Sequence, residues 1–543
     1  MAKFRSALQT MVQRHAALRT AIGTDEHGAA VQVIAPRVDF DIPLIDLSAM
    51  PEEEREAELA GRMQQLADQP LDIHRAPLFH MALYKMGPED HAFMFVPHHL
   101  VWDGWSFDIY QTELSAIYGA LVRGQKHTLP EPPVSMGDYA QWYADWMAQP
   151  EFTRQLDFWK QRFARMPAPR AAKTDMPRRA GMSGKGGVNW IHIDQPTTQR
   201  LRDVARQHDV TLSMLALGAY VLMMSGAIDS RSVVIATPVR GREVPELESV
   251  MGFFNNVLPL PFQVDRTLGF GGFIRYVKNE LVAVMGYQQV PFERMATEPE
   301  FVNLAQGAGL YQGLFSFQDA RERPLDFGGL AHKQVHLLQR GATDDLGLWL
   351  LEKPHGLEGP IAYNADIYLP ETGTAFRDRF VEILRTLADQ PNVPVAELLA
   401  PADSASARIL TRLASSAESP PQTVAAREKA ATSNGNPASL LQPEQAQLAQ
   451  IWAGVLNIDV NDIRATDNFF DLGGDSLLAM RVVQQSEQSF GQRIEARRYM
   501  FESLAQLAAS QVTSPAPLTP AEEPSPARPG LLGRVFSGWG RKG

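Results

Sequence analysis

A short apolar run that ends in two adjacent histidines is the feature that most constrains the fold of this chain. The run Ala92–Val96 is short, apolar and rich in aromatic residues, which predicts a buried strand. His98 and His99 are therefore expected where the strand ends and the chain turns. A histidine there can exchange a proton near neutral pH, Asp103 can pair with an arginine, and Gly104 lets a backbone or thin ligand approach. Taken alone, a pair of histidines is more often hydrogen-bonded in a structural loop than catalytic.

Composition excludes several classes of function. The chain has 543 residues, 45% of them hydrophobic, which is enough for two or three cores. Its net charge of -11 gives no electrostatic footprint for nucleic acid, so no nucleic-acid partner is expected. The absence of cysteine excludes disulfides, cysteine-ligated metals and a cysteine nucleophile, and we assign no residue to a metal site. Any thioester on this chain must use a thiol that a cofactor supplies.

The hydropathy pattern predicts no membrane span. The N-terminal residues lead into an amphipathic helix and not into the apolar core of a signal peptide. The longest apolar stretch, Leu212–Ala227, is too short and too interrupted to cross a bilayer and predicts a core helix. A cytoplasmic protein is the expectation.

Alternating strands and helices predict an α/β sandwich. In the first half we predict helices at 4–22, 52–67 and 105–123 and strands at 30–34 and 77–85. The next helix carries an aromatic stripe, expected to serve packing, at Tyr139, Trp142, Tyr143 and Trp146. In the second half we predict strands at 188–193, 233–238 and 363–369 and helices at 198–208, 212–225 and 376–389. Composition rich in Ala, Ser and Pro predicts a flexible linker at 401–440 and a disordered tail at 513–543.

Asp103 needs a positive partner if its turn is enclosed, because an unpaired buried charge costs several kcal/mol. Arg19 and Arg242 are both candidates, and either could instead be a solvated arginine. Asp103 is therefore assigned to architecture and not to proton transfer.

A glycine-rich segment near the C-terminus places a serine at the start of a predicted helix. FFDLGGDSL spans residues 469–477 and precedes an apolar helical pattern. Its two glycines leave Ser476 exposed at the start of a helix, where a phosphate ester meets free backbone N–H groups and the positive end of the helix dipole. A plain N-cap serine is the alternative.

These motifs resemble those of a known family. HHLVWDG (98–104) is similar to the HHxxxDG signature of the condensation-domain superfamily of nonribosomal peptide synthetases, which is related in fold to chloramphenicol acetyltransferase. FFDLGGDSL resembles the phosphopantetheine attachment motif of peptidyl carrier domains. Further segments that resemble condensation motifs are RHAALRT (14–20), MGDYAQW (136–142), ATPVRGR (236–242), MGFFNNVLPL (251–260) and YQQVPFE (287–293).

The resemblance implies two acetyltransferase-like lobes with a substrate tunnel between them, followed by a small all-α four-helix carrier bundle. The implied boundaries are 1–165 and 180–400 for the lobes of the condensation domain, 401–440 for the linker and 441–512 for the carrier. His99 would deprotonate or orient the nucleophile, His98 would hold the local structure, and Asp103 and Gly104 would complete the motif. Asn255 and Asn256 are interpreted as turn residues, and only the resemblance suggests that they line the tunnel.

The implied activity is that of an acyltransferase, which joins a donor acyl thioester to an amine or hydroxyl acceptor. Ser476 would carry covalent 4'-phosphopantetheine, attached by a phosphopantetheinyl transferase. The implied partners are an upstream donor carrier domain and a separate adenylation domain, since the 401–440 linker cannot contain one.

Three alternatives are weighed against condensation. Epimerisation domains share HHxxxDG, but they act on a carrier that precedes them, whereas here the carrier follows. Heterocyclisation domains replace the first histidine with aspartate. A non-catalytic docking protein is the third alternative, because the family's first motif, with its serine and glutamine, is missing. The chain is therefore expected to begin inside the domain or to have a naturally trimmed start.

Overall fold

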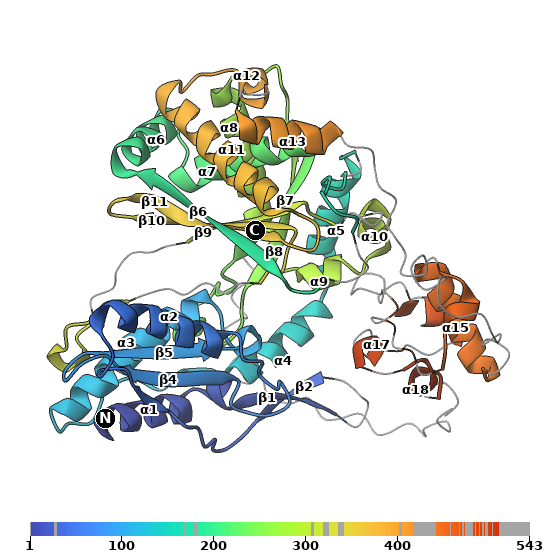
Figure 1. Cartoon of the computed structure of the whole chain (residues 1–543). Helices are drawn as coiled ribbons and strands as arrows, with labels where there is room; N and C mark the ends of the chain where they lie inside the picture. Colours follow the sequence, from blue (N-terminus) through green and yellow to red (C-terminus); the bar gives the residue numbers. More distant parts are fainter. Residues whose placement is uncertain are drawn as a thin grey trace.

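The structure is a computed structural model in which two α/β lobes are followed by a small helical domain (Figure 1). The residues that it describes are 2–25, 30–167, 170–178, 182–305, 309–318, 325–334, 341–400, 404–415, 441–456, 458–465, 467, 469, 472, 482–483, 485–487, 489–490, 494, 498–501 and 503–509.

The first lobe is a three-stranded sheet covered by helices on both faces. Its strands, in spatial order, are β3 (Leu44–Asp46), β4 (Phe79–Lys85) and β5 (His91–Pro97). One face packs against α1 (Ala2–Arg14) and α3 (Gly104–Val122), and the other packs against α2 (Glu52–Ala67). The sheet therefore places the end of β5, and the histidines after it, directly before the first turn of α3.

The predicted helix at 4–22 is too long. α1 ends at Arg14, a short 3-10 turn (η1, Ala16–Arg19) follows, and β1 (Thr20–Thr24) pairs with β2 (Ala30–Ile34). The reason is tertiary, because Arg14 Nε and His15 Nε2 both lie 2.7 Å from Glu113 Oε2 of α3. That contact holds His15 in an extended conformation and ends the helix.

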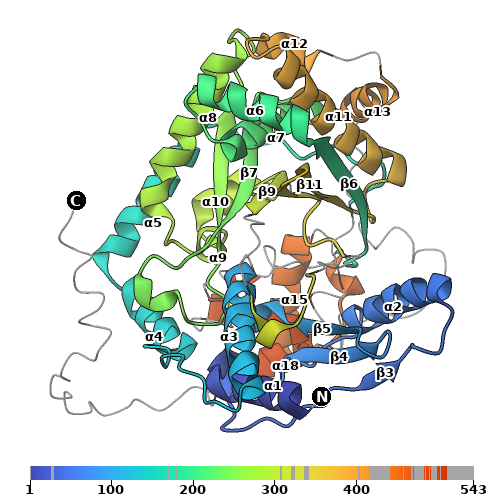
Figure 2. The same ribbon diagram turned by 90° about the vertical axis from the view of Figure 1, so that its left-hand side faces the viewer.

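Two helices connect the lobes along one side of the molecule (Figure 2). α4 (Met136–Met147) begins with a capping box formed by Ser135 and Asp138, and its aromatic stripe stacks as predicted, with the Tyr139 and Tyr143 rings 5.5 Å apart. α5 (Pro150–Ala164) follows, and its Trp159 is fully buried in the core of the second lobe.

The second lobe is a six-stranded mixed sheet. Its strands, in spatial order, are β6 (Gly186–Asp194), β11 (Gly356–Asn364), β10 (Leu346–Lys353), β9 (Gly313–Gln318), β7 (Ser232–Val239) and β8 (Asn256–Gln263). The β7–β9 and β9–β10 pairs are parallel and the other pairs are antiparallel. Among the helices that share its core are α6 (Gln195–Gln207), α7 (Leu212–Ala227), α8 (Phe270–Val284) and α11 (Pro370–Asp389).

The apolar helix α7 is the centre of this core, as predicted, and Leu215, Ala216 and Tyr220 are fully buried. Within the described part of the chain, no single helix has the length and apolar character of a membrane span. Only α6 and α7 taken together reach that length and composition, and they are bent by 96°.

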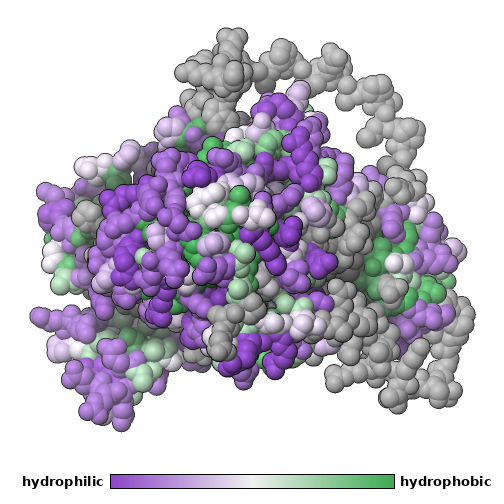
Figure 3. Space-filling model, turned by 90° about the horizontal axis from the view of Figure 1, so that it is seen from above, coloured by the Kyte–Doolittle hydropathy of each residue, from purple (hydrophilic) through white to green (hydrophobic). Residues whose placement is uncertain are grey.

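The remaining elements are short. They are η3 (Pro245–Leu247), η4 (Met285–Tyr287), α9 (Phe292–Met295), α10 (Pro299–Ala305), η5 (Phe327–Gly329) and α12 (Val395–Leu399). Seen from above, the surface over the helices of the second lobe is mainly hydrophilic, as expected for amphipathic helices that bury one face (Figure 3).

Three predictions of local structure differ from what is observed. The strand predicted at 363–369 is the end of β11, which stops at Asn364, because the chain then turns into α11. Helical spacing within the helix predicted at 105–123 places Phe107 on the inward face, but Phe107 is 38% exposed. Residues 405–415, inside the range predicted as linker, form α13 (Ala405–Ser415), because Leu410 and Leu413 fit into the second core.

The C-terminal domain is helical in its described residues. Its helices are α15 (Pro443–Leu456), α17 (Arg498–Phe501) and α18 (Leu504–Ala509), with a 3-10 turn, η7 (Val460–Asp462). Trp452, Phe469 and Tyr499 are fully buried, and their ring centroids lie 5.2 to 6.1 Å apart. The four-helix count stays a prediction, and the predicted tail at 513–543 and residues 416–440 of the linker lie outside the described residues.

Candidate active site

The histidine motif lies where the sequence predicted it, between a strand and a helix. β5 ends at Pro97, and the backbone N–H of His98 donates to Leu78 O of the neighbouring chain segment at 2.8 Å. His99 begins a single 3-10 turn, η2 (His99–Val101). Asp103 then caps α3, because its Oδ1 accepts from the backbone N–H of Ser106 at 2.9 Å.

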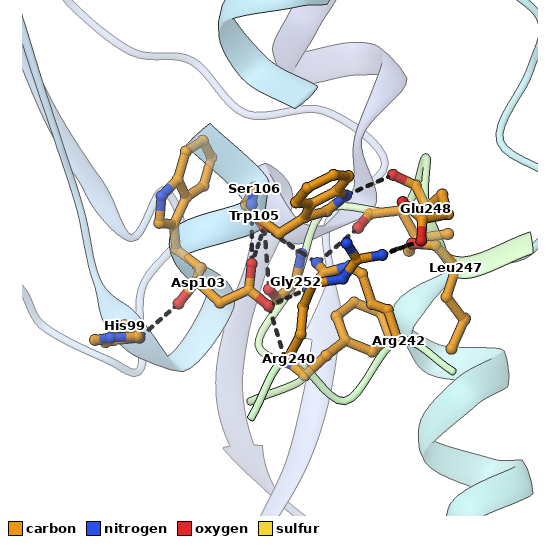
Figure 4. A network of polar contacts seen from close by, with 12 residues as sticks. His99, Asp103, Trp105, Ser106, Arg240, Arg242, Leu247, Glu248 and Gly252 are labelled. Carbon is orange, nitrogen blue, oxygen red and sulfur yellow. Dashed lines mark hydrogen bonds and ion pairs between the residues drawn. The ribbon is translucent and has the colours of Figure 1, made fainter. Parts of the chain in front are cut away.

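His99 has a defined tautomer. Its Nδ1 lies 2.6 Å from the backbone carbonyl oxygen of Trp102 (Figure 4). A carbonyl oxygen only accepts, so Nδ1 carries the proton and the neutral ring has its lone pair on Nε2. The His99 residue is exposed, and its ring meets that of Phe253 edge to face at a centroid distance of 5.2 Å. Among the described residues no hydrogen-bond partner is seen for Nε2, which therefore keeps its lone pair available on an exposed residue.

His98 is arranged in the opposite way. Its Nδ1 accepts a hydrogen bond from the backbone N–H of Leu100 at 3.1 Å, so this nitrogen carries the lone pair. Burial, and then the neighbouring His99, lower the pKa of His98. These contacts support the predicted assignment of His98 to local structure.

Asp103 forms a fully buried ion pair with Arg242 from the loop after β7 (Figure 4). Its Oδ1 also accepts from Ser106 Oγ at 2.8 Å, and its Oδ2 accepts from the backbone N–H of Phe254 at 3.2 Å. Both side chains have an exposed fraction of 0%. The carboxylate of Asp103 is thus enclosed by donors, and the architectural role predicted for it fits these contacts.

Arg242, and not Arg19, is the partner of Asp103. Arg242 donates from Nε to Leu247 O at 3.2 Å and from Nη2 to Val250 O at 3.0 Å, so the guanidinium also organises its own loop. Arg19 instead donates to backbone carbonyls of Val12 and Ala35 in the first lobe.

A second connection joins the same loop to α3. Trp105 Nε1 donates to Glu248 O at 2.9 Å, and the guanidinium of Arg240 lies 3.9 Å from the centre of the Trp105 ring (Figure 4). Arg240 also pairs with Glu248. The loop of the second lobe is thus fixed to the first turn of α3 by an ion pair, a cation–π contact and hydrogen bonds.

Gly104 is not required by close packing of the described residues. A Cβ atom built on Gly104 would meet none of their atoms within 4 Å. Two uses of Gly104 were predicted, the approach of another backbone and the approach of a ligand. No described backbone approaches Gly104 closely, so the approach of a ligand remains.

Asn256 is a supporting residue that the sequence did not identify. It was interpreted as a turn residue, but it begins β8 and its Nδ2 donates to Gln288 O and Val290 O, both at 2.7 Å. Its Oδ1 accepts from the backbone N–H of Phe292 at 3.0 Å. Ser106 was also missed, although an aspartate directly before a helix is a signal for a cap that accepts from the backbone N–H two or three residues into the helix.

Ser476 lies outside the described residues, and so do the glycines before it. The described residues on either side are anchored in the helical core: Phe469 and Val482 are fully buried, Val483 is nearly so, and Leu472 packs against them. A phosphopantetheine group on Ser476 would supply the thiol that the cysteine-free chain lacks.

The family models agree with both halves of the chain. The model described as condensation domain matches residues 1–410, and the model described as phosphopantetheine attachment site matches residues 446–510. One of the linear gramicidin synthase subunits of Brevibacillus parabrevis is 30% identical over 397 residues, which are 72% of this chain and 5% of that protein. Chondramide synthase cmdD of Chondromyces crocatus is 28% identical over 392 residues, 72% of this chain and 10% of that protein. The chain thus spans a small fraction of these relatives.

Solved structures have the same fold. The first condensation domain of the calcium-dependent antibiotic synthetase, in complex with a substrate analogue, matches with a TM-score of 0.62 and 23% identity over 73% of this chain and 90% of that one. The X-domain from teicoplanin biosynthesis matches with a TM-score of 0.62 and 21% identity over 73% of this chain and 89% of that one. The predicted two-lobed α/β fold related to chloramphenicol acetyltransferase is confirmed.

Epimerisation and non-catalytic docking are not favoured by these comparisons, since condensation is the family that matches and synthetase subunits are among the relatives. The chain belongs to the condensation-domain family, and its condensation domain is followed by a carrier domain for covalent phosphopantetheine.

Proposed function

We propose that this chain transfers an acyl group from a donor thioester to an amine held on its own carrier domain, and that His99 acts on that amine. In this reaction a C–N bond forms, the C–S bond of the donor breaks, and the thiol leaves with a proton. The observation that carries the proposal is the tautomer of His99, whose Nδ1 is bonded to Trp102 O so that Nε2 is free at an accessible position.

A free imidazole nitrogen is suited to this step. An attacking amine must lose a proton, and a group that accepts it near neutral pH lowers the barrier. Nε2 of His99 is held for that task, while His98 and Asp103 hold the turn around it. Gly104 leaves space beside the motif. A hydroxyl acceptor would use the same geometry and give an ester.

The carrier determines the partners. Ser476 carries phosphopantetheine, so the chain needs a phosphopantetheinyl transferase, and the donor thioester comes from an upstream carrier domain. Residues 411–445, which separate the two matched domains, are too few for an adenylation domain. The aminoacyl group on Ser476 is therefore supplied by an adenylation domain outside these 543 residues.

The test is a single turnover on the full-length chain. A phosphopantetheinyl transferase and aminoacyl-coenzyme A load Ser476 directly, an acyl N-acetylcysteamine thioester serves as the donor, and intact-protein mass spectrometry follows the acyl-aminoacyl product. We expect His99→Ala to lower the rate by about 100-fold or more, the typical contribution of a general base. Loading of Ser476 should be unchanged.

The matched control is His91→Ala. His91 is an exposed histidine at the other end of β5, and its loss should leave the rate within about twofold of the parent chain. An unchanged rate in the His99 variant would remove the catalytic assignment of His99. Conversion of the L-aminoacyl group to its D form without acyl transfer would instead indicate epimerisation.

A further inference from the structure

Three exposed apolar side chains belong to the surroundings of His99. Leu100 is 47% exposed, and Phe107 and Phe253 are each 38% exposed. Phe253 meets the His99 ring, and Phe107 meets Trp102, whose carbonyl binds His99, at a ring distance of 5.1 Å. Apolar groups left exposed beside a reactive polar group are typical of a ligand-binding wall.

The backbone on both sides of Phe253 is fixed. Ser106 Oγ accepts from Gly252 N at 3.1 Å and lies 3.1 Å from Gly252 O, while Asp103 Oδ2 accepts from Phe254 N at 3.2 Å. The next side chain, Phe254, is buried with its ring 4.1 Å from the guanidinium carbon of Arg242. The Asp103–Arg242 pair therefore holds the backbone that presents Phe253 to His99.

Phe253 itself is not needed for the core, because the residue is 38% exposed and its ring meets that of His99. An aromatic ring held by a rigid backbone at an exposed position is a wall that is already in place before a ligand binds. Edge-to-face contact also limits rotation of the imidazole about the bond that the Nδ1 hydrogen bond already restrains.

We propose that Phe253 selects the acceptor, by contacting the side chain of the aminoacyl group on the Ser476 arm and favouring an apolar side chain. The inference rests on the proposed condensation function. The attacking amine must reach Nε2 of His99, and the side chain of an α-amino acid branches one bond away from that nitrogen. The acceptor side chain, and not the distant part of the donor, therefore lies beside the wall that includes Phe253.

The test compares two acceptors of nearly equal shape. The chain is loaded on Ser476 with leucyl or asparaginyl phosphopantetheine from the corresponding aminoacyl-coenzyme A, and rates are measured with the same panel of acyl N-acetylcysteamine donors. An apolar wall discriminates against an unsatisfied amide, so the leucyl acceptor should react about 10- to 100-fold faster. Phe253→Ala should reduce this ratio to about threefold or less, and Phe253→Leu should retain most of it.

The ratio separates selection from structural support. A purely structural role would lower both rates equally and leave the ratio unchanged, which would overturn the inference. A preference of the parent chain for the asparaginyl acceptor would also overturn the inference. A leucyl-to-asparaginyl ratio that changes with the donor would overturn it as well. Val282→Ala, which truncates an apolar side chain that is 56% exposed on α8, is the matched control and should change neither rate nor ratio. Absence of product from every loaded acceptor in the parent chain would instead contradict the condensation function itself.

Discussion

Asp103 of the first lobe and Arg242 of the second form an ion pair in which both side chains are completely shielded from water. The two residues are 139 positions apart in the sequence, and the backbone of the loop that carries Arg242 returns to Asp103 a second time at Phe254. One carboxylate therefore caps α3, neutralises the guanidinium and fixes the segment beside His99. Stability of the lobe contact and geometry of the histidine site depend on the same group.

Asp103→Ala should destabilise the condensation domain strongly. It leaves the Arg242 charge buried without its partner, and breaking a buried pair in this way costs about 3–5 kcal/mol. The free energy of unfolding is measured by denaturant titration. The matched control is Asp389→Ala, which breaks an exposed pair with Arg200 at 3.5 Å and should cost less than about 1 kcal/mol. Equal losses in the two variants would contradict the role given to the buried pair.

Glu113 should make the stability of the first lobe depend on pH. Burial acts to raise the pKa of Glu113, but hydrogen bonds with His15 and Arg14 outweigh it, so the pKa lies below its ordinary value of 4.5. A carboxyl with a depressed pKa contributes stability that is present above its unfolded pKa and is lost as pH falls through the folded one. Glu113→Gln should therefore cost about 1–3 kcal/mol at pH 7.

The difference in free energy of unfolding between Glu113→Gln and the parent chain should shrink as pH falls below about 4.5, because the carboxyl is then protonated first in the unfolded chain and, at still lower pH, in the folded one. Denaturant titrations at several pH values measure it. The exposed Gln9 on α1 offers a control, because Gln9→Ala removes no titrating group and should leave the pH dependence unchanged. A loss that is the same at about pH 4 and pH 7 would show that charge is not the cause.

Asn256→Ala should loosen the segment around residues 288–292. Three hydrogen bonds with the backbone of that segment are lost, and two carbonyls and one N–H lose their partner, for a cost of about 2–4 kcal/mol. Asn256→Asp keeps the acceptor for Phe292 N but loses both donors, so its loss should be comparable. Asn279→Ala on the exposed face of α8 is the control. Hydrogen exchange of the 288–292 amides would detect the local change, and unchanged exchange would contradict this assignment.

Local pattern was sufficient for much of the fold. The apolar run before the histidines predicted β5, and the charged amphipathic pattern predicted α2 at its observed bounds of Glu52–Ala67. The pattern failed where a distant residue decides the outcome. Glu113 ends α1 at Arg14, well before the end that the helical spacing suggests, and no local signal encodes a partner 98 residues away.

In the candidate active site, too, local pattern predicted part of the arrangement and distant contacts decided the rest. The motif letters placed His98, His99, Asp103 and Gly104 together, and the cost of an unpaired buried charge required an arginine. Two arginines met that requirement equally well in the sequence, and only the return of the loop after β7 to α3 selects Arg242. Nothing in the sequence indicated the position of Phe253, since an aromatic residue in an apolar motif predicts a core position and not an exposed wall.

The phosphopantetheinylated chain should not acylate itself. Activation of an amino acid needs an adenylating domain, and residues 411–445 between the two matched domains cannot contain one. Mixed with ATP and free amino acids, the full-length chain should gain no mass beyond the arm on Ser476, as followed by intact-protein mass spectrometry. Addition of an adenylating partner should produce one aminoacyl increment, and Ser476→Ala should gain neither arm nor increment. An ATP-dependent aminoacyl gain without a partner would mean that an activating site lies within these residues.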